Sequence, residues 1–381
     1  MAAPYTHHNR PSRKKNHYIF YCQFRDRHGR RGTVMSTGKT TKGEAERWAT
    51  EKLKKGTTHL RRSLRFAAYT KNWFDWDESA YITRKRKRGA LSHSAVDNQA
   101  QLLHNHINPS FKDMLIDRIT SEEIEDWLIQ LADKKSPATA NRSLSVLKVI
   151  FKEAQRLGHI AISPATNIEK LHEPEREKDY LTGDEVDELF TWKNFDFVWG
   201  GDLNHYLINA LGSTTGMRMG EIQALRWEDI YDGHIHVNGS WDRKYGIVPP
   251  KAKSKRWVPL ITPIEQALQR LKSQSLPAPH NSDNTFIFSN SLGTKPVDHK
   301  LIAKRLYAAL SQIGIDERER RKRNITFHSW RHAFNTNLLG KVSEADLRRV
   351  IGHRTTAMTD HYDHLTKQSV ERLKEVILFS A

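Results

Sequence analysis

At 381 residues the chain is too long for one ordinary hydrophobic core, so two or three domains are expected. Its 62 Lys and Arg residues outnumber 44 Asp and Glu residues and give a net charge of +18 with His neutral. That excess favours a polyanionic partner over a plain basic protein or one bound to an anionic membrane, because each phosphate bound by Lys or Arg releases condensed counterions. No run of 18 apolar residues is present, and residues 1–10 lack the apolar core of a signal peptide, so we expect a cytoplasmic protein.

The cysteine and histidine content argues against a metal site. Cys22 is the only cysteine, so neither an internal disulfide nor a Cys-based zinc site can form. The pairs His104/His106 and His328/His332 leave binding by histidines alone open, but the second pair lacks the Glu of a His-Glu-x-x-His metalloprotease helix. We therefore expect no metal and no other cofactor.

The N-terminal residues predict a small basic α+β module. Residues 1–16 are polar and basic and predict a flexible arm, whereas residues 17–25 alternate in the manner of a strand. Turn-forming residues at 26–29 allow residues 31–36 to return as a second strand. A capping-box pattern at Thr41 then begins a helix that ends near Lys55.

Residues 64–168 are helical in pattern. Ser92 begins a helix that Asn108-Pro109 ends, and Thr120 begins another with a capping box. Ser136-Pro137 begins a long helix that Gly158 stops. The basic run at residues 84–88, closed by Gly89, has the composition of a solvated loop, but it would lie beside phosphates if this domain clamps a duplex.

Residues 172–179 are charged and contain a proline, which indicates a linker. Beyond them, Thr182 begins the first helix of a mostly helical domain. Its strand candidates are residues 234–237 and 256–260. No internal repeat is present.

Five residues of this last domain suit chemistry on a phosphate. His328 and Arg331 lie three apart in a helical segment and therefore project from one face. Arg218 lies at a glycine-flanked turn that leads into a helix, and the sequence Gly352-His353 precedes Tyr362 by nine residues. Two guanidinium groups, two imidazoles and a phenol can together bind and attack a phosphodiester.

The order Arg218, His328-x-x-Arg331, Gly352-His353, Tyr362 resembles that of the tyrosine recombinases, and the whole chain resembles a phage-type or conjugative-element integrase. The resemblance implies a multidomain fold that is mainly α with small β-sheets. It would comprise an N-terminal α+β arm-binding module (residues 1–60), a helical core-binding domain (residues 64–171), the linker (172–179) and a mostly α catalytic domain with a small β-sheet (residues 180–381).

In this scheme Arg218 and Arg331 compensate the charge that builds on the non-bridging oxygens, since each planar guanidinium can bond two oxygens. His328 and His353 donate to the same oxygens or help to deprotonate the nucleophile. Glu221 either orients a neighbouring cation or is an ordinary carboxylate on a helix surface.

Tyr362 is the expected nucleophile. At a pKa of about 10 only about one phenol in a thousand is ionised at pH 7, so cations or a base must assist it. The resemblance assigns protonation of the leaving sugar oxygen to a lysine before the last strand; we favour Lys251, and Lys253 is its rival. A phosphotyrosine preserves the energy of the broken bond, so no ATP is needed. Accordingly, Gly38-Lys39-Thr40 lacks the partner glycine of a phosphate-binding loop, because position 33 is Thr.

The expected partners are duplex DNA with core-type and arm-type attachment sites, three further copies of the chain in a homotetramer, a host DNA-bending protein and an excisionase. The polar face of the long helix offers side chains for the major groove, namely Thr139, Asn141, Arg142, Ser145 and Lys148. The candidates for DNA contact are Arg84, Lys85, Arg86, Lys87, Arg88, Arg142 and Lys148. The apolar tail after Tyr362 packs either within its own chain or on a neighbouring protomer.

Three alternatives remain open at this point. A chromosome-dimer-resolving recombinase and a type IB topoisomerase-like enzyme share the chemistry, although the extra basic N-terminal module disfavours the first. A sequence-specific DNA-binding regulator without catalysis belongs to another class. The intact set of Arg, His, Arg, His and Tyr argues against it, because binding alone needs no phenol at the scissile phosphate.

Overall fold

The computed structural model describes most of the chain as two compact units, residues 1–175 and 176–381, which we take in turn. The described residues are 5–11, 18–25, 31–54, 64–89, 91–174, 179–251, 255–274, 285–290, 293–339 and 341–352. No helix within these ranges has both the length and the apolar character that crossing a membrane requires.

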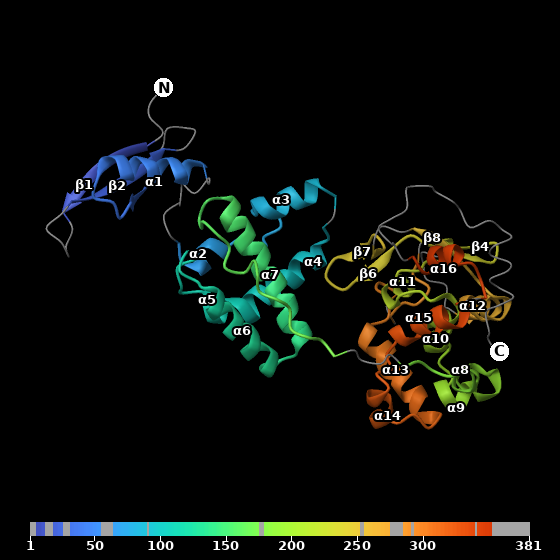
Figure 1. Ribbon diagram of the computed structural model, residues 1–381. Coiled ribbons are helices and arrows are strands. Elements are labelled where there is room, and N and C mark those ends of the chain that lie inside the picture. The colour runs from blue at the N-terminus through green and yellow to red at the C-terminus, as the bar shows by residue number, and fades with distance from the viewer. Residues whose placement is uncertain are drawn as a thin grey trace. The chain divides into compact units, whose positions relative to one another are not determined.

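The first unit begins with a three-stranded antiparallel sheet in the order β1-β2-β3. Its strands are β1 (Tyr5–Pro11), β2 (Tyr18–Arg25) and β3 (Arg31–Ser36), and helix α1 (Lys42–Lys54) follows them (Figure 1). Alternate residues of β2 point towards α1, so that Cys22 and Phe24 share a small core with Ala49. The two predicted strands and the predicted helix are confirmed.

The expectation of a flexible arm over residues 1–16 is wrong for residues 5–11. Strand β1 pairs with β2 along its whole length, from Tyr5 opposite Phe24 to Pro11 opposite Tyr18. The Tyr5 ring also packs edge-on against Phe24, with the ring centroids 5.8 Å apart. The polar composition of β1 concealed it, because an edge strand gains its stability from a neighbour's backbone rather than from apolar side chains of its own.

The rest of the first unit is helical. Its elements are α2 (Phe66–Thr70), α3 (Ala80–Lys87), α4 (His93–Leu102), the π-helical turn η1 (Leu103–Ile107), α5 (Asn108–Phe111), α6 (Ser121–Lys134) and α7 (Pro137–Arg156). The long helix α7 supplies much of the core through Leu144, Leu147 and Phe151 (Figure 1). Ser136 caps α7 and Thr120 forms a full capping box on α6, as the sequence predicts.

The prediction that Asn108-Pro109 ends a helix is wrong. The chain passes through the π turn η1, in which the Asn108 N–H donates to the Leu103 carbonyl, and continues as α5 to Phe111. A proline lacks an N–H and clashes with the carbonyl four residues earlier, and a widened turn relieves both problems. The helix therefore continues for another turn and buries Phe111 in the core.

The second unit is mostly helical with two small sheets. Its helices are α8 (Gly183–Phe190), η2 (Trp192–Asn194), α9 (Phe195–Trp199), α10 (Leu203–Thr215), α11 (Met219–Gln223), η3 (Trp227–Asp229), α12 (Thr262–Gln274), α13 (His299–Gln312), α14 (Glu317–Lys322), α15 (His328–Leu338) and α16 (Glu344–Ile351). Thr182 forms the predicted capping box on α8.

Three antiparallel strands form the first sheet of this unit in the order β4-β5-β8, namely β4 (Ile230–Tyr231), β5 (His234–Val237) and β8 (Arg256–Pro259). Strands β5 and β8 are the two predicted strands, and Val237 lies opposite Arg256. The hairpin of β6 (Ser240–Asp242) and β7 (Gly246–Val248) was not predicted.

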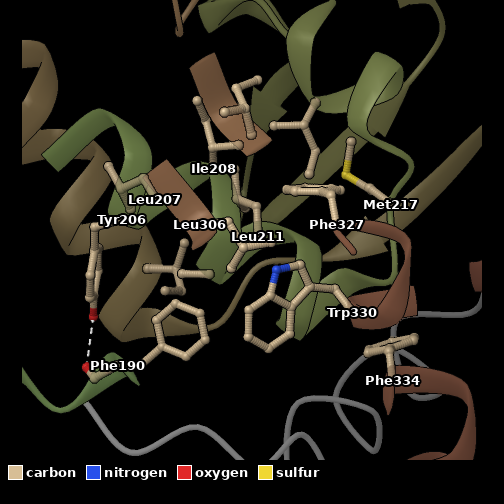
Figure 2. Packing of buried hydrophobic residues seen from close by; sticks show 14 of the residues in the cluster. Phe190, Tyr206, Leu207, Ile208, Leu211, Met217, Leu306, Phe327, Trp330 and Phe334 are labelled. Atoms are coloured by element: carbon tan, nitrogen blue, oxygen red, sulfur yellow. Dashed lines mark hydrogen bonds between the residues drawn. The ribbon is translucent and has the colours of Figure 1, made fainter. Parts of the chain in front are cut away.

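The core of the second unit is built around α10 and α15. Figure 2 shows Trp330 of α15 and Phe327, the residue just before this helix, among the apolar residues of α10, with Phe190 beside them. A Cβ on Gly212 would lie 3.0 Å from Phe327 Cζ and 3.1 Å from Trp330 Cδ1, so glycine lets the two helices approach closely. The Trp330 indole N–H donates to Asn209 Oδ1 over 3.0 Å. This contact fixes the rotation of α15 and hence the direction of its next residue, Arg331.

Candidate active site

A sharp turn between α10 and α11 positions Arg218. Helix α10 ends at Gly216, whose φ of +61° lies in the left-handed region. A Cβ there would lie 2.6 Å from Phe334 Cδ1, so both the conformation and the space require glycine. Arg218 then directly precedes α11, as the sequence predicts.

Glu221 is the centre of a buried ionic cluster. One of its carboxylate oxygens accepts the Arg218 backbone N–H at 2.9 Å, and the other accepts Arg218 Nη1 at 2.9 Å. Arg256 adds a bidentate contact, with Nη1 3.1 Å and Nη2 2.7 Å from the two oxygens. Burial by itself would raise the pKa of Glu221, but the hydrogen bonds and charge of Arg256, followed by those of Arg218, hold it below its ordinary value. Glu221 is only 1% exposed, so the expectation of a carboxylate on a helix surface is wrong.

Arg331 joins this cluster from α15. Its Nη1 donates to the Gly216 carbonyl at 2.8 Å, and its Nη2 donates to the Ile351 carbonyl at the end of α16. Burial lowers the pKa of Arg331 to about 9, and the charges of Arg218 and Arg256 act in the same direction. The group is still protonated at neutral pH.

Arg218 and Arg256 thus bond one carboxylate, and the charge of Arg331 is close enough to interact with all three groups. Three guanidinium groups share a single carboxylate, which leaves two positive charges uncompensated within the cluster. Such an arrangement favours an anion, and the planar donors of Arg suit phosphate oxygens. Arg218, Glu221 and Arg331 are candidates from the sequence, and the structure brings these three together.

Arg256 was not predicted from the sequence. Its partner Glu221 lies 35 residues earlier, so no local pattern links the two. The available signal was the alternation of β8, in which Arg256 and Val258 are both buried while Trp257 is more exposed. A basic residue at a buried strand position needs a partner, and this requirement could have identified it.

His328 and Arg331 project from the same helix, but their environments differ. His328 is the first residue of α15 and is exposed, whereas Arg331 is buried. The His328 ring lies edge-on to His332, with the ring centroids 4.9 Å apart. An exposed imidazole at this position is accessible to a bound phosphodiester.

The remaining site candidates lie at or beyond the limits of the described residues. Lys251 is exposed and directly precedes residues 252–254, so Lys253 is outside the described part of the chain. His353 and Tyr362 also lie outside it, because the described residues end at Gly352. Their roles remain predictions.

In the first unit the basic run lies on a helix, so the expectation of a solvated loop is wrong for most of it. Arg84, Lys85, Arg86 and Lys87 form the last turn of α3, and Arg88 is its C-cap. Arg84 pairs with Glu153 of α7, and Arg86 lies 4.5 Å from the centroid of the Trp76 ring. Lys85, Arg86, Lys87 and Arg88 are exposed and remain candidates for DNA contact.

The polar face of α7 is partly used inside the unit. Asn141 is buried and bonds to both the N–H and the carbonyl of Leu171, so the expectation that it reads bases is wrong. Lys148 donates to the Ile168 carbonyl. Arg142 is exposed and is therefore the better candidate on this helix.

Among the described residues, no three His, Cys, Asp or Glu side chains are grouped in a way that could hold a metal ion.

Comparison with known protein families gives a consistent result. Residues 179–369 match the model of the phage integrase family, and residues 74–170 match that of the phage integrase central domain. The chain is 28% identical over 250 residues to the tyrosine recombinase XerD of Lacticaseibacillus casei, which is 64% of this chain and 78% of that protein.

Solved structures show the same fold. The Tn1549 transposon integrase (residues 82–397) in complex with circular intermediate DNA superposes with a TM-score of 0.59 at 22% identity, covering 76% of this chain and 96% of that one. A lambda integrase tetramer bound to a Holliday junction gives a TM-score of 0.55 at 17% identity, covering 90% of this chain and 96% of that one.

The fold and the family match define a tyrosine-type site-specific DNA recombinase, an enzyme that breaks and rejoins DNA strands. The chain belongs to the phage integrase family.

Proposed function

We propose that the chain is an integrase that inserts a mobile element into DNA, and excises it, through a 3′-phosphotyrosyl intermediate. The observation that carries the proposal is the buried cluster of Arg218, Arg256 and Arg331 around Glu221, which retains two positive charges for an anion. The strongly basic chain and the family membership make a DNA backbone phosphate the expected anion.

Each chemical step is assigned to a residue of this chain. The phenolic oxygen of Tyr362 attacks the phosphorus, and the bond to the 5′ oxygen breaks. Lys251, or its rival Lys253, gives a proton to that leaving oxygen. Arg218 and Arg331 bind the non-bridging oxygens, where negative charge increases, and His328 and His353 donate to the same oxygens or accept the phenol proton. In the reverse reaction the 5′ hydroxyl of a partner strand attacks the phosphotyrosine and releases Tyr362.

The proposed domain roles follow from the same reading. Residues 64–171 and 180–381 bind a core-type site, residues 172–179 link them, and residues 1–60 bind arm-type sites. The lambda integrase tetramer on a Holliday junction supports a homotetramer that exchanges strands in pairs. We also propose a host DNA-bending protein and an excisionase as partners, and the bacterial cytoplasm, at the nucleoid, as the place of action.

The sheet module is the feature that favours integration. The two family matches begin at residues 74 and 179, so β1, β2, β3 and α1 precede everything that they cover. The lambda integrase structure covers 90% of this chain, compared with 76% for the Tn1549 piece that begins at its residue 82. The lambda integrase structure therefore extends over more of this chain, which supports the view that the sheet module has a counterpart in that integrase.

Chromosome-dimer resolution is the second candidate function, because the relative from Lacticaseibacillus casei is a XerD recombinase. Deletion of residues 1–60 distinguishes the two. For an integrase, the deletion should spare cleavage of an isolated core site and abolish integration between two attachment sites. For a resolving recombinase, recombination between two core sites should proceed without the module.

The test of the chemistry uses a nicked duplex whose site is first selected from a random library by binding to the full-length chain. Wild-type protein should become covalently joined to the DNA through a 3′ phosphate, as detected on a denaturing gel. Tyr362→Phe should bind the same duplex and form no adduct. A persisting adduct in that variant would remove Tyr362 from its role.

A further inference from the structure

Arg256 joins three parts of the candidate active site through one side chain. It is the first residue of β8 and is buried. Its Nη1 and Nη2 contact both oxygens of Glu221, and its Nε donates to the Val350 carbonyl at 2.6 Å. All three guanidinium nitrogens are therefore bonded within the protein, and the side chain is only 5% exposed, so Arg256 is poorly placed to bind a substrate phosphate.

The contact with α16 pairs Arg256 with Arg331. Val350 and Ile351 are consecutive residues in the last turn of α16; Arg256 bonds the first carbonyl and Arg331 bonds the second. The last four carbonyls of a helix have no partner inside the helix, and cations are favourable there. The same two arginines thus fix the end of α16, which the left-handed Gly352 then closes.

The contact with Glu221 determines how that carboxylate holds Arg218. Glu221 binds Nη1 of Arg218, whereas Nε and Nη2 of Arg218 have no hydrogen-bond partner within the described ranges. If Arg256 were absent, Arg218 would be the only cation bonded to a buried carboxylate. A buried charge with too few partners recruits whatever donor is nearest, and here that donor is the Arg218 side chain.

We propose that Arg256 is a positioning residue for strand cleavage: by holding Glu221 and the Val350 carbonyl at once, it keeps Arg218 and Arg331 directed at the phosphate. The inference rests on the proposed function, because it concerns the same site. Arg256 acts through its neighbours and does not contact the substrate.

The test compares two nicked duplexes that differ only at the scissile linkage, one a phosphodiester and the other a neutral methylphosphonate. Both carry the library-selected site, and single-turnover adduct formation is measured with saturating full-length protein. Arg256→Met removes every donor, whereas Arg256→Lys keeps the charge but cannot bond Glu221 and Val350 together. We expect Arg256→Met to slow cleavage of the phosphodiester about a hundredfold, the size of effect seen when one preorganised donor is lost.

The methylphosphonate separates positioning from a purely structural role. A neutral linkage needs less charge compensation, so Arg256→Met and Arg256→Lys should lose much less activity on it than on the phosphodiester. Equal losses on the two substrates, or full activity of both variants on the phosphodiester, would overturn the inference. If Arg256→Met does not fold, Arg256→Lys alone gives the same comparison.

Arg323→Met is the matched control. Arg323 bonds both oxygens of Glu185, as well as Asp179 and the Tyr180 carbonyl, so it is as heavily bonded as Arg256. Any activity that this control loses should be lost equally on the two substrates. Absence of an adduct with the wild-type protein would contradict the proposed function itself, which is a different outcome from equal losses by the Arg256 variants.

Discussion

Each unit of the molecule holds a glutamate between two arginines, yet the two clusters differ in character. In the first unit Glu153 bonds Arg156 Nε at 2.8 Å and also pairs with Arg84. The arginine side chains there are 41% and 53% exposed. In the second unit the arginines bonded to Glu221 are only 5% and 24% exposed.

This difference shows that burial and excess charge, rather than the number of ion pairs, distinguish a candidate active site. Water screens the Glu153 cluster, so its charges interact weakly with anything that approaches. The Glu221 cluster is shielded from water and contains a third guanidinium, Arg331, whose pKa is lowered by burial and by its cationic neighbours. An anion that enters the second cluster meets two uncompensated charges in a medium of low polarity.

The largest expected effect separates the two glutamates. Glu221→Ala leaves Arg218 and Arg256 without their shared partner, and breaking a buried pair costs about 3–5 kcal/mol. Glu153→Ala should cost about 1 kcal/mol or less, because both of its arginines reach water. Urea denaturation monitored separately in each unit gives the two free energies of unfolding. Similar losses of stability in the two variants would contradict the difference between the two clusters.

The cleavage rate should depend on an arginine of the buried cluster but not on one of the exposed cluster. Arg331→Ala removes one preorganised donor to a developing charge, which costs about 3 kcal/mol and slows cleavage about a hundredfold or more. Arg156→Ala is the control, since its guanidinium belongs to the exposed cluster, and it should cleave at the wild-type rate. Near-normal single-turnover cleavage by Arg331→Ala would count against a phosphate clamp at this position.

A pH dependence should appear only in the buried cluster. Burial, with the charges of Arg218 and Arg256, makes the pKa of Arg331 lower in the folded chain than its ordinary value. The unfolded state therefore binds more protons above about pH 9, and stability rises with pH there. The unfolding free energy of the wild type minus that of Arg331→Met should increase by up to about 1.4 kcal/mol per pH unit above pH 9. A difference that stays constant between pH 8 and pH 10 would contradict the lowering of the Arg331 pKa by burial and by its cationic neighbours.

The smallest effect concerns affinity rather than rate and belongs to the first unit. If Arg142 of α7 contacts a DNA phosphate, Arg142→Ala should reduce the slope of log K against log salt by about one. Lys152 is exposed on the same helix, ten residues further on, and Lys152→Ala should leave that slope unchanged. Equal slopes for the two variants would remove Arg142 from the contact surface.

The parts of the fold that local rules determine were predictable from the sequence. Alternation found β2 and β3, and the capping patterns at Thr120 and Thr182 found the starts of α6 and α8. Strand β1 was not predictable, because its pairing with β2 depends on backbone groups that every sequence carries. The π turn before Pro109 was missed because it depends on tertiary packing: the helix continues past the proline so that Phe111 stays in the core.

The candidate site was predictable where a motif marks it and hidden where distant residues meet. Arg218 and Arg331 were found from their order in the chain and their local context. Arg256 was missed because its burial depends on Glu221 and Val350, which lie 35 and 94 residues away in sequence. Pairing over such distances is a property of the packed fold, and composition and periodicity do not record it.

The most direct test of the central claim is to identify the residue that becomes joined to DNA. Wild-type protein would be incubated with the nicked, library-selected duplex, digested with trypsin and analysed by tandem mass spectrometry for a nucleotide-bearing peptide. We expect a 3′-phosphate linkage to Tyr362 that forms much more slowly in Arg331→Ala. A linkage to any other side chain, or one that forms equally fast in that variant, would contradict it.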